Sequence, residues 1–246
     1  MKEDLIHNLN LINNRIKNAC IKTGRNPNEV KLLLATKTVS AERIKIALEN
    51  GATLIAENKV QELKEKYEDL KDVSHENHFI GHLQTNKIKD ILKYGVSCVQ
   101  SLDRLDLAEK LNQRLLQEGK TIEVLIQVNT SGEESKFGVH PDQAVDLVKD
   151  VAKLRALKIK GLMTIGLFSA ETEKVRACFK LLKNLQQEII SQNIPNVHMQ
   201  ELSMGMSGDL ETAIEEGSTM VRVGTAVFGA RMYPDSYYWD ENKTVN

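Results

Sequence analysis

Short apolar runs alternate with longer segments of helical period through most of the chain. These runs, rich in aliphatic and β-branched residues, predict eight strands at about 31–36, 53–56, 78–81, 97–101, 123–129, 159–165, 199–204 and 220–224. Amphipathic patterns between them predict helices at 41–50, 60–70, 85–95, 104–119, 141–154, 171–192 and 209–216. Strands that alternate with helices in this way are typical of βα units around a parallel sheet.

Residues at the ends of these segments support the predicted limits. Ser40 is suited to cap the helix that stops at Gly51, and Pro141 lies in the first turn of another helix. A further helix over residues 2–23 precedes the first strand, and its apolar face is made by Leu5, Leu9, Ile12 and Ile16. No linker or low-complexity tract interrupts the series, so a single domain is favoured.

The succession of βα units predicts an α/β fold, a single (β/α)8 TIM barrel with an extra N-terminal helix; a doubly wound open sheet is the alternative. The 246 residues suit one barrel, and 41% hydrophobic residues suffice for a full core. In a barrel the loops after the strands open on one face, so functional side chains should gather at the carboxyl ends of the strands.

Composition and charge narrow the classes of function. The chain has 33 Lys and Arg against 34 Asp and Glu, which argues against a nucleic-acid or anionic-membrane partner. It has no long apolar run and no signal-peptide pattern, so we expect a soluble, cytoplasmic protein. Cys20, Cys98 and Cys178 match no metal-ligand spacing and are odd in number, so neither a metal site nor a disulfide framework is expected.

Polar groups follow the predicted strands. They are Lys37, Glu57, Asn58, His82, Gln84, Ser101, Asn129, Thr130, Met163 with Thr164, Ser203, Ser207, Arg222, Gly224 and Thr225. Strand ends also meet solvent, so any single one of these side chains can be polar for that reason alone. Taken together they indicate a site on this face of the barrel.

Two loops near the end of the chain have the composition of a phosphate site. SMGMSGD at 203–209 leads into a helix, and RVGTAVFGA at 222–230 follows the eighth strand. Free amides, hydroxyls and helix N-termini bind phosphate, and barrels favour the loops after strands seven and eight for this purpose. Glycines that serve tight turns alone are the alternative. Neither loop matches a Walker or dinucleotide fingerprint.

Lys37 closes the first apolar run, LLLAT, and opens onto the same predicted face. Partial burial would lower the pKa of its amine, as a Schiff-base lysine requires. The alternative is a lysine that extends from the strand end into solvent. An amine opposite a phosphate site favours pyridoxal 5'-phosphate (PLP), which carries both an aldehyde and a phosphate.

The segments LLLATKT, AENKVQE, HFIGHLQTNK, SGEESKFG, GLMTIG and SMGMSGDLETAIEEGSTMVRVGTAVFG resemble the PLP homeostasis proteins, also called the YggS or PROSC family. The similarity runs from about Val30 to Arg231. It implies a barrel similar to the N-terminal domain of alanine racemase that binds PLP without established turnover. Such proteins influence the distribution of PLP in the cell, and PLP-dependent apoenzymes are candidate recipients.

The resemblance also implies roles for individual residues. Lys37 would form the Schiff base, Asn58 would lie beside the ring and Arg222 would face the pyridine nitrogen. Met163 would contribute to the pocket wall. The residues expected at the phosphate are Ser203, Gly205, Met206, Ser207, Gly224 and Thr225. Ala56 departs from the glycine that usually opens the second motif, and Lys136 is either involved in PLP handling or a solvated loop lysine.

From the sequence we expect a PLP-binding carrier or regulator. We expect it to form one domain, with a lead-in at 1–29, a barrel at 30–231 and a tail at 232–246. A PLP-dependent amino-acid racemase or lyase is the runner-up, and a barrel for another phosphorylated metabolite is a more distant alternative. An enzyme would need a further acid–base group, for which His82, Tyr233, Tyr237 and Tyr238 are the candidates.

Overall fold

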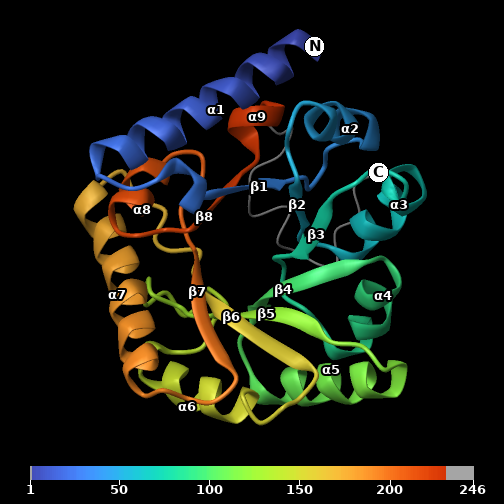
Figure 1. The fold of residues 1–246 in the computed structure, drawn as a ribbon, viewed down its shortest axis with the longest axis vertical. Coiled ribbons are helices and arrows are strands. Elements are labelled where there is room, and N and C mark those ends of the chain that lie inside the picture. Colours follow the sequence, from blue (N-terminus) through green and yellow to red (C-terminus); the bar gives the residue numbers. More distant parts are fainter. Residues whose placement is uncertain (1, 231–246) are drawn as a thin grey trace.

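Eight parallel strands close into a barrel in chain order in the computed structural model, which describes residues 2–230 (Figure 1). The strands are β1 (Lys31–Ala35), β2 (Leu54–Glu57), β3 (Glu76–Phe79), β4 (Val96–Leu102), β5 (Ile122–Gln127), β6 (Leu157–Met163), β7 (Val197–Ser203) and β8 (Met220–Val223). Since β8 pairs with β1, the barrel prediction is confirmed and the open sheet is wrong.

Helices surround the barrel (Figure 1). They are α1 (Lys2–Lys22), α2 (Ala41–Glu49), α3 (Val60–Leu70), α4 (Ile88–Lys93), α5 (Leu105–Glu118), α6 (Pro141–Val151), α7 (Thr172–Ser191), α8 (Leu210–Glu215) and α9 (Thr225–Phe228), with 3-10 turns η1 (Pro27–Glu29) and η2 (Thr85–Lys87). Each helix predicted from the sequence is present. The predicted tail at 232–246 lies outside the described residues.

Three local predictions needed correction. The strands β3, β6 and β7 each begin two residues earlier than expected; the start of β3 was missed because Glu76 and Asn77 are polar. The four-residue helix α9 was not predicted, since it is too short to show helical periodicity. Ser40 does occupy the N-cap of α2, but its side chain makes no capping hydrogen bond.

The core has two layers because neighbouring strand residues face opposite sides of the barrel wall. Inside the barrel, one cluster contains Leu33, Leu54, Ala56 and Met220, and another contains Cys98, Leu125 and Met163. Between the strands and the helices lie larger apolar clusters. The apolar face of α1 (Leu5, Leu9, Ile12 and Ile16) belongs to this outer layer and packs with residues of α2, α8 and α9.

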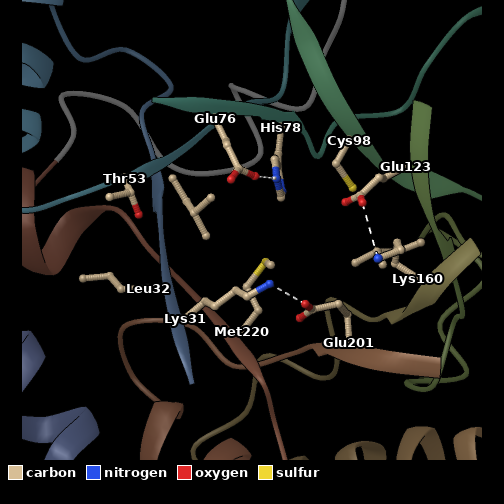
Figure 2. Close-up of a pocket in the computed structure, with 12 residues that line it drawn as sticks. Lys31, Leu32, Thr53, Glu76, His78, Cys98, Glu123, Lys160, Glu201 and Met220 are labelled. Atoms are coloured by element: carbon tan, nitrogen blue, oxygen red, sulfur yellow. Dashed lines mark hydrogen bonds and ion pairs between the residues drawn. The ribbon is translucent and has the colours of Figure 1, made fainter. Parts of the chain in front are cut away.

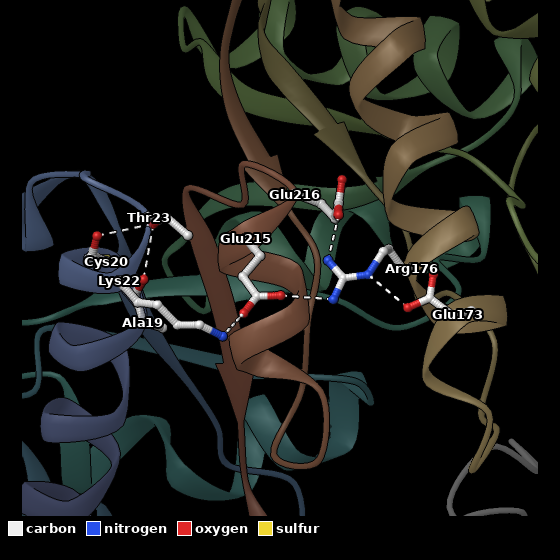
Figure 3. A network of polar contacts seen from close by, with 8 residues as sticks. All are labelled: Ala19, Cys20, Lys22, Thr23, Glu173, Arg176, Glu215 and Glu216. Atoms are coloured by element: carbon white, nitrogen blue, oxygen red, sulfur yellow. Dashed lines mark hydrogen bonds and ion pairs between the residues drawn. The ribbon is translucent and has the colours of Figure 1, made fainter.

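Ion pairs attach α1 to the last helices of the barrel (Figure 3). Glu215 of α8 accepts hydrogen bonds from Lys22 of α1 at 2.8 Å and from Arg176 of α7 at 2.8 Å. Glu211, one turn before Glu215 on α8, accepts two hydrogen bonds from Arg15 of α1, at 2.6 and 2.8 Å. Arg15 also donates to the Ser207 carbonyl at 3.1 Å. The extra helix is therefore bonded directly to the loop after β7.

Paired charges line the amino-terminal mouth of the barrel, around a cavity of about 240 Å³ (Figure 2). Lys31 contacts Glu201 at 2.5 Å, and Lys160 contacts Glu123 at 3.4 Å. Burial raises the pKa of the Cys98 thiol beside them, so it stays protonated. The residues predicted to form the functional site lie elsewhere, because they follow the opposite ends of the strands.

Candidate functional site

The predicted site residues gather where the strands end. Lys37 lies two positions beyond β1 and Asn58 directly follows β2. Met163 and Ser203 are the last residues of β6 and β7, which pair there in register. Arg222 lies within β8. Lys37 and Asn58 are 7% and 8% exposed, so both are buried at the rim rather than extended into solvent.

The β1 and β2 exits are joined by direct hydrogen bonds. The Thr36 amide donates to the Ala56 carbonyl at 2.9 Å, which sets Lys37 beside the start of the Asn58 loop. Gly81, from the HFIGHLQ motif, packs against the backbone of Asn58 from the other side. A Cβ atom at position 81 would lie 1.9 Å from the Asn58 carbonyl oxygen, so only glycine fits without movement of Asn58.

Arg222 reaches the barrel interior and is held by two acceptors. One guanidinium nitrogen donates to Ser203 Oγ at 2.8 Å and another to the Thr164 carbonyl at 2.7 Å. Burial lowers the pKa of Arg222 to about 10, partly offset by Asp209. The guanidinium therefore remains charged at neutral pH and keeps further N–H donors for a ligand.

A hydrogen-bond chain continues from Arg222 through the barrel. Ser203 Oγ donates to Gln100 Oε1 at 2.7 Å, and Gln100 Nε2 donates to His78 Nδ1 at 2.8 Å. This places the His78 proton on Nε2, which faces Glu76 at 3.7 Å. Burial and the nearby Lys31 charge lower the pKa of His78 to about 4, so the ring is neutral and accepts from Gln100.

The two loops of the predicted phosphate site lie side by side. The Arg222 amide donates to the Gly205 carbonyl at 2.9 Å, and Thr225 Oγ1 lies 3.5 Å from Ser207 Oγ. Gly205 has a φ of 92°. A Cβ there would come within 2.4 Å of the Ala213 side chain, so a glycine is needed to fold this loop onto α8. Gly224 is the N-cap of α9, and Thr225 is its first residue.

Two predicted phosphate contacts are already bonded inside the protein. The Met206 amide donates to Asp209 Oδ1 at 2.5 Å, so it is occupied as a donor. Ser203 gives its hydroxyl proton to Gln100 and accepts from Arg222, and it is fully buried. In the structure Met206 thus helps to close its loop and Ser203 orients Arg222, and the contacts of both residues with a phosphate stay predictions.

The two residues whose role the sequence left open occupy the rim. The His82 ring stacks on Phe137 with 4.0 Å between centroids, and its Nδ1 lies 4.0 Å from Asp103. Lys136 donates to the Gly166 carbonyl at 2.9 Å and pairs with Glu133, so it links the loops after β5 and β6. It is thus bonded to the protein rather than simply solvated.

The sequence did not single out Gln100 or His78 as site residues. A faint signal existed, because each is a polar residue beside apolar ones within a strand. The sequence did not show that both side chains point into the barrel and lie under Ser203. Which residues meet inside the barrel depends on the stagger of its strands, which is set only when the barrel closes. Within residues 2–230, no group of three or more metal-ligating side chains can hold a metal ion, and no helix is long and apolar enough to span a membrane.

These groups together offer an amine, a guanidinium and a site for a small anion. Lys37 supplies the amine, Arg222 supplies fixed N–H donors, and the adjoining Ser207 and Thr225 loops supply hydroxyls near two helix N-termini. A ligand that spans these features would carry an electrophilic carbon, a ring acceptor and a phosphate-like group.

Comparisons with known proteins agree with this arrangement. The family model described as alanine racemase, N-terminal domain, matches residues 4–232. The pyridoxal phosphate homeostasis protein of Aquifex aeolicus is 45% identical over 219 residues, which cover 89% of this chain and 95% of the relative. The corresponding protein of Haemophilus influenzae is 40% identical over 232 residues, covering 94% of this chain and 97% of the relative.

Solved structures show the same barrel. PipY of Synechococcus elongatus, solved with PLP bound, superposes with a TM-score of 0.77 at 29% identity, covering 87% of this chain and all of PipY. Alanine racemase of Clostridium difficile, at 17% identity and a TM-score of 0.73, shares the fold over 93% of this chain and 58% of its own. With curated relatives matched over nearly their whole length, the chain belongs to the pyridoxal phosphate homeostasis protein family, whose barrel is that of the alanine racemase N-terminal domain.

Proposed function

We propose that this protein binds PLP covalently through Lys37 and acts in PLP homeostasis as a carrier or regulator. The observation that carries the proposal is the convergence of three groups on one barrel face: the buried Lys37, the anchored Arg222, and the paired loops of Ser207 and Thr225. Each matches one part of PLP, namely the aldehyde, the pyridine nitrogen and the phosphate. The PipY structure with PLP bound supports the same ligand.

The residues present fit the cofactor. Ser207, Gly224 and Thr225 would hold the phosphate, with Gly205 shaping the loop. Asn58 and Met163 would flank the ring, and Met163 is already part of the barrel's inner apolar cluster. His82 stacks with Phe137 at the rim and would limit access of water from that side.

Arg222 would set the chemical strength of the bound cofactor, which supplies electron withdrawal from a carbon attached to its imine. A guanidinium donates a hydrogen bond to the pyridine nitrogen but yields no proton, so this nitrogen stays largely unprotonated and the withdrawal is weak. Ser203 and the Thr164 carbonyl hold Arg222 for this contact. A weakened electron sink fits a PLP carrier, but an arginine at this position also suits a racemase, so turnover has to be measured directly.

PLP-dependent apoenzymes are the proposed recipients, and the cytoplasm is the proposed compartment. Its reducing conditions suit three buried cysteines that are all free thiols. We assign the barrel at 30–231 to PLP binding, preceded by a lead-in at 1–29; the tail at 232–246 lies outside the described residues.

The test is borohydride reduction of the protein mixed with PLP, followed by peptide mass spectrometry. We expect the reduced adduct on Lys37, and no visible absorption band in Lys37→Ala. An adduct on another lysine, or a colourless wild-type protein, would overturn the assignment. Turnover of an amino acid well above that of free PLP, lost in Lys37→Ala, would replace the carrier by a racemase or lyase.

A further inference from the structure

A buried ionic cluster lies directly behind the turn that presents Lys37. Its members are Glu57, at the end of β2, and Glu62 and Lys66, one turn apart on α3. The Lys66 ammonium donates to Glu57 Oε1 at 2.8 Å, to Glu62 Oε2 at 2.5 Å and to the Thr36 carbonyl at 2.8 Å. All three of its hydrogens are therefore used, and one of them reaches the residue before Lys37.

Lys37 is the second residue of a tight turn, Thr36 to Val39, closed by a hydrogen bond from the Val39 amide to the Thr36 carbonyl at 2.9 Å. The third residue, Thr38, has a φ of 65°. Positive φ in a turn normally requires Gly or Asn, and a β-branched residue such as Thr38 is strained there. The turn needs outside support to persist.

The cluster supplies this support on both sides of Lys37. Thr36 Oγ1 donates to Glu57 Oε1 at 2.6 Å, and the Thr38 amide donates to both oxygens of Glu62 at 3.0 Å. The backbone flanking Lys37 is thus attached to three charged side chains. Because Glu57 precedes Asn58, the same contacts also fix the spacing between the Lys37 turn and the Asn58 loop.

The burial of these charges is costly, which argues for a role beyond stability. Desolvation raises the pKa of Glu57 to about 7, although Lys66 acts in the opposite direction, and Glu57 Oε2 has no hydrogen-bond partner. Well-packed apolar residues at such positions are often as stable or more stable. An apolar replacement would attach α3 to β2, but it would offer no acceptor to Thr38 and no donor to Thr36.

We propose that Glu57, Lys66 and Glu62 are positioning residues that hold the strained Thr36–Val39 turn and thereby aim the Lys37 amine into the cofactor site. The inference rests on the proposed function, since it assigns the cluster to the lysine that would bind PLP. It concerns how that lysine is presented, and so it can fail while PLP binding at Lys37 stands.

The test compares Glu62→Ala with Glu65→Ala, which removes a carboxylate on the same helix that accepts a hydrogen bond from Gln61 at the exposed surface. PLP is mixed with each full-length protein, and the rate of adduct formation on Lys37 is followed by absorbance and borohydride trapping. We expect about tenfold slower reaction for Glu62→Ala, as loss of about 1.4 kcal/mol of orientation predicts. Glu65→Ala should react at the wild-type rate.

Thr38→Gly separates positioning from simple stability. Glycine accepts positive φ without strain, so Thr38→Gly should restore most of the rate in the Glu62→Ala background while leaving the loss of α3 stability uncorrected. Amide hydrogen exchange at Thr38, measured without PLP, gives a second readout. Exchange should become faster in Glu62→Ala but not in Glu65→Ala.

Three outcomes would overturn the inference. Glu62→Ala could react with PLP at the wild-type rate, Thr38→Gly could fail to restore a lowered rate, or Thr38 exchange could stay unchanged. In each case trapping on Lys37 in the wild-type protein would leave the proposed function intact. Wild-type protein that gives no adduct on Lys37 would overturn the function and the inference together.

Discussion

Replacement of Gln100 by leucine is expected to destabilise the barrel from inside. Gln100 is fully buried and bonded to Ser203 and His78, and leucine has a similar size but no polar atoms. Ser203 would lose its acceptor and His78 Nδ1 its donor. Two buried groups without partners cost about 3 kcal/mol together, which lowers Tm by about 6–12 °C for a chain of this length.

The same substitution should also weaken PLP binding. Once Ser203 is free to rotate, Arg222 loses one of its two fixed acceptors, and a loss of about 1 kcal/mol raises the Kd for PLP about fivefold. Thermal unfolding without PLP and a spectroscopic PLP titration measure the two effects separately. Neither effect needs Gln100 to touch the cofactor.

Gln186→Leu provides a matched control. Gln186 is also a buried glutamine, but it links α7 to the Met199 carbonyl of β7 and is not bonded to Arg222 or Ser203. It should lower Tm without changing the Kd for PLP. The reasoning is refuted if Gln100→Leu unfolds at the wild-type temperature, or if both variants weaken PLP binding equally.

Three further predictions concern other parts of the site. Gly81→Ala should lower the free energy of unfolding by about 1–3 kcal/mol in denaturant unfolding, because the new methyl group meets the Asn58 backbone. In the control Gly208→Ala the methyl group meets open space, so the free energy of unfolding should stay that of the wild type. Since the pKa of Glu57 is raised from 4.5 to about 7 on folding, its contribution to stability is full below pH 4.5 and is lost as the pH rises through 7. The unfolding free energy of the wild type relative to Glu57→Gln should therefore fall by about 3 kcal/mol across this range, and a flat difference would contradict the buried position of the carboxylate. Ser207→Ala and Thr225→Val should each weaken PLP binding by roughly 1–3 kcal/mol, and unchanged titrations in both would place the phosphate elsewhere.

The barrel could be predicted from the sequence because the hydrophobic pattern of each segment agrees with its place in the fold. Buried parallel strands are continuous apolar runs, and the helices between them are amphipathic, so all eight strands could be placed from one chain. Confirmed strand ends in turn located Lys37, Asn58 and Arg222 on one face. Their roles toward a ligand stay predictions.

The remaining features depend on contacts between distant segments. Glu62 and Lys66 are recognisable as an i, i+4 pair on a helix, but nothing local reveals that Lys66 also bonds Glu57 and Thr36. The positive φ of Thr38 is equally hidden, since threonine is an uncommon choice for it. Both follow only when β1, β2 and α3 are in place.

The attachment of α1 has a consequence for how the protein folds during synthesis. Its apolar face packs with Leu210, Ile214, Val227 and Phe228, and β1 pairs with β8. The segments that are synthesised first, α1 and β1, therefore cannot complete their packing until the last helices and strand have been synthesised. Loop closure over such separations is slow. During synthesis α1 can pack on α2 early but lacks its partners in α8 and α9 until those helices have been made, and the barrel is expected to close only once β8 is available to pair with β1, in one late cooperative step.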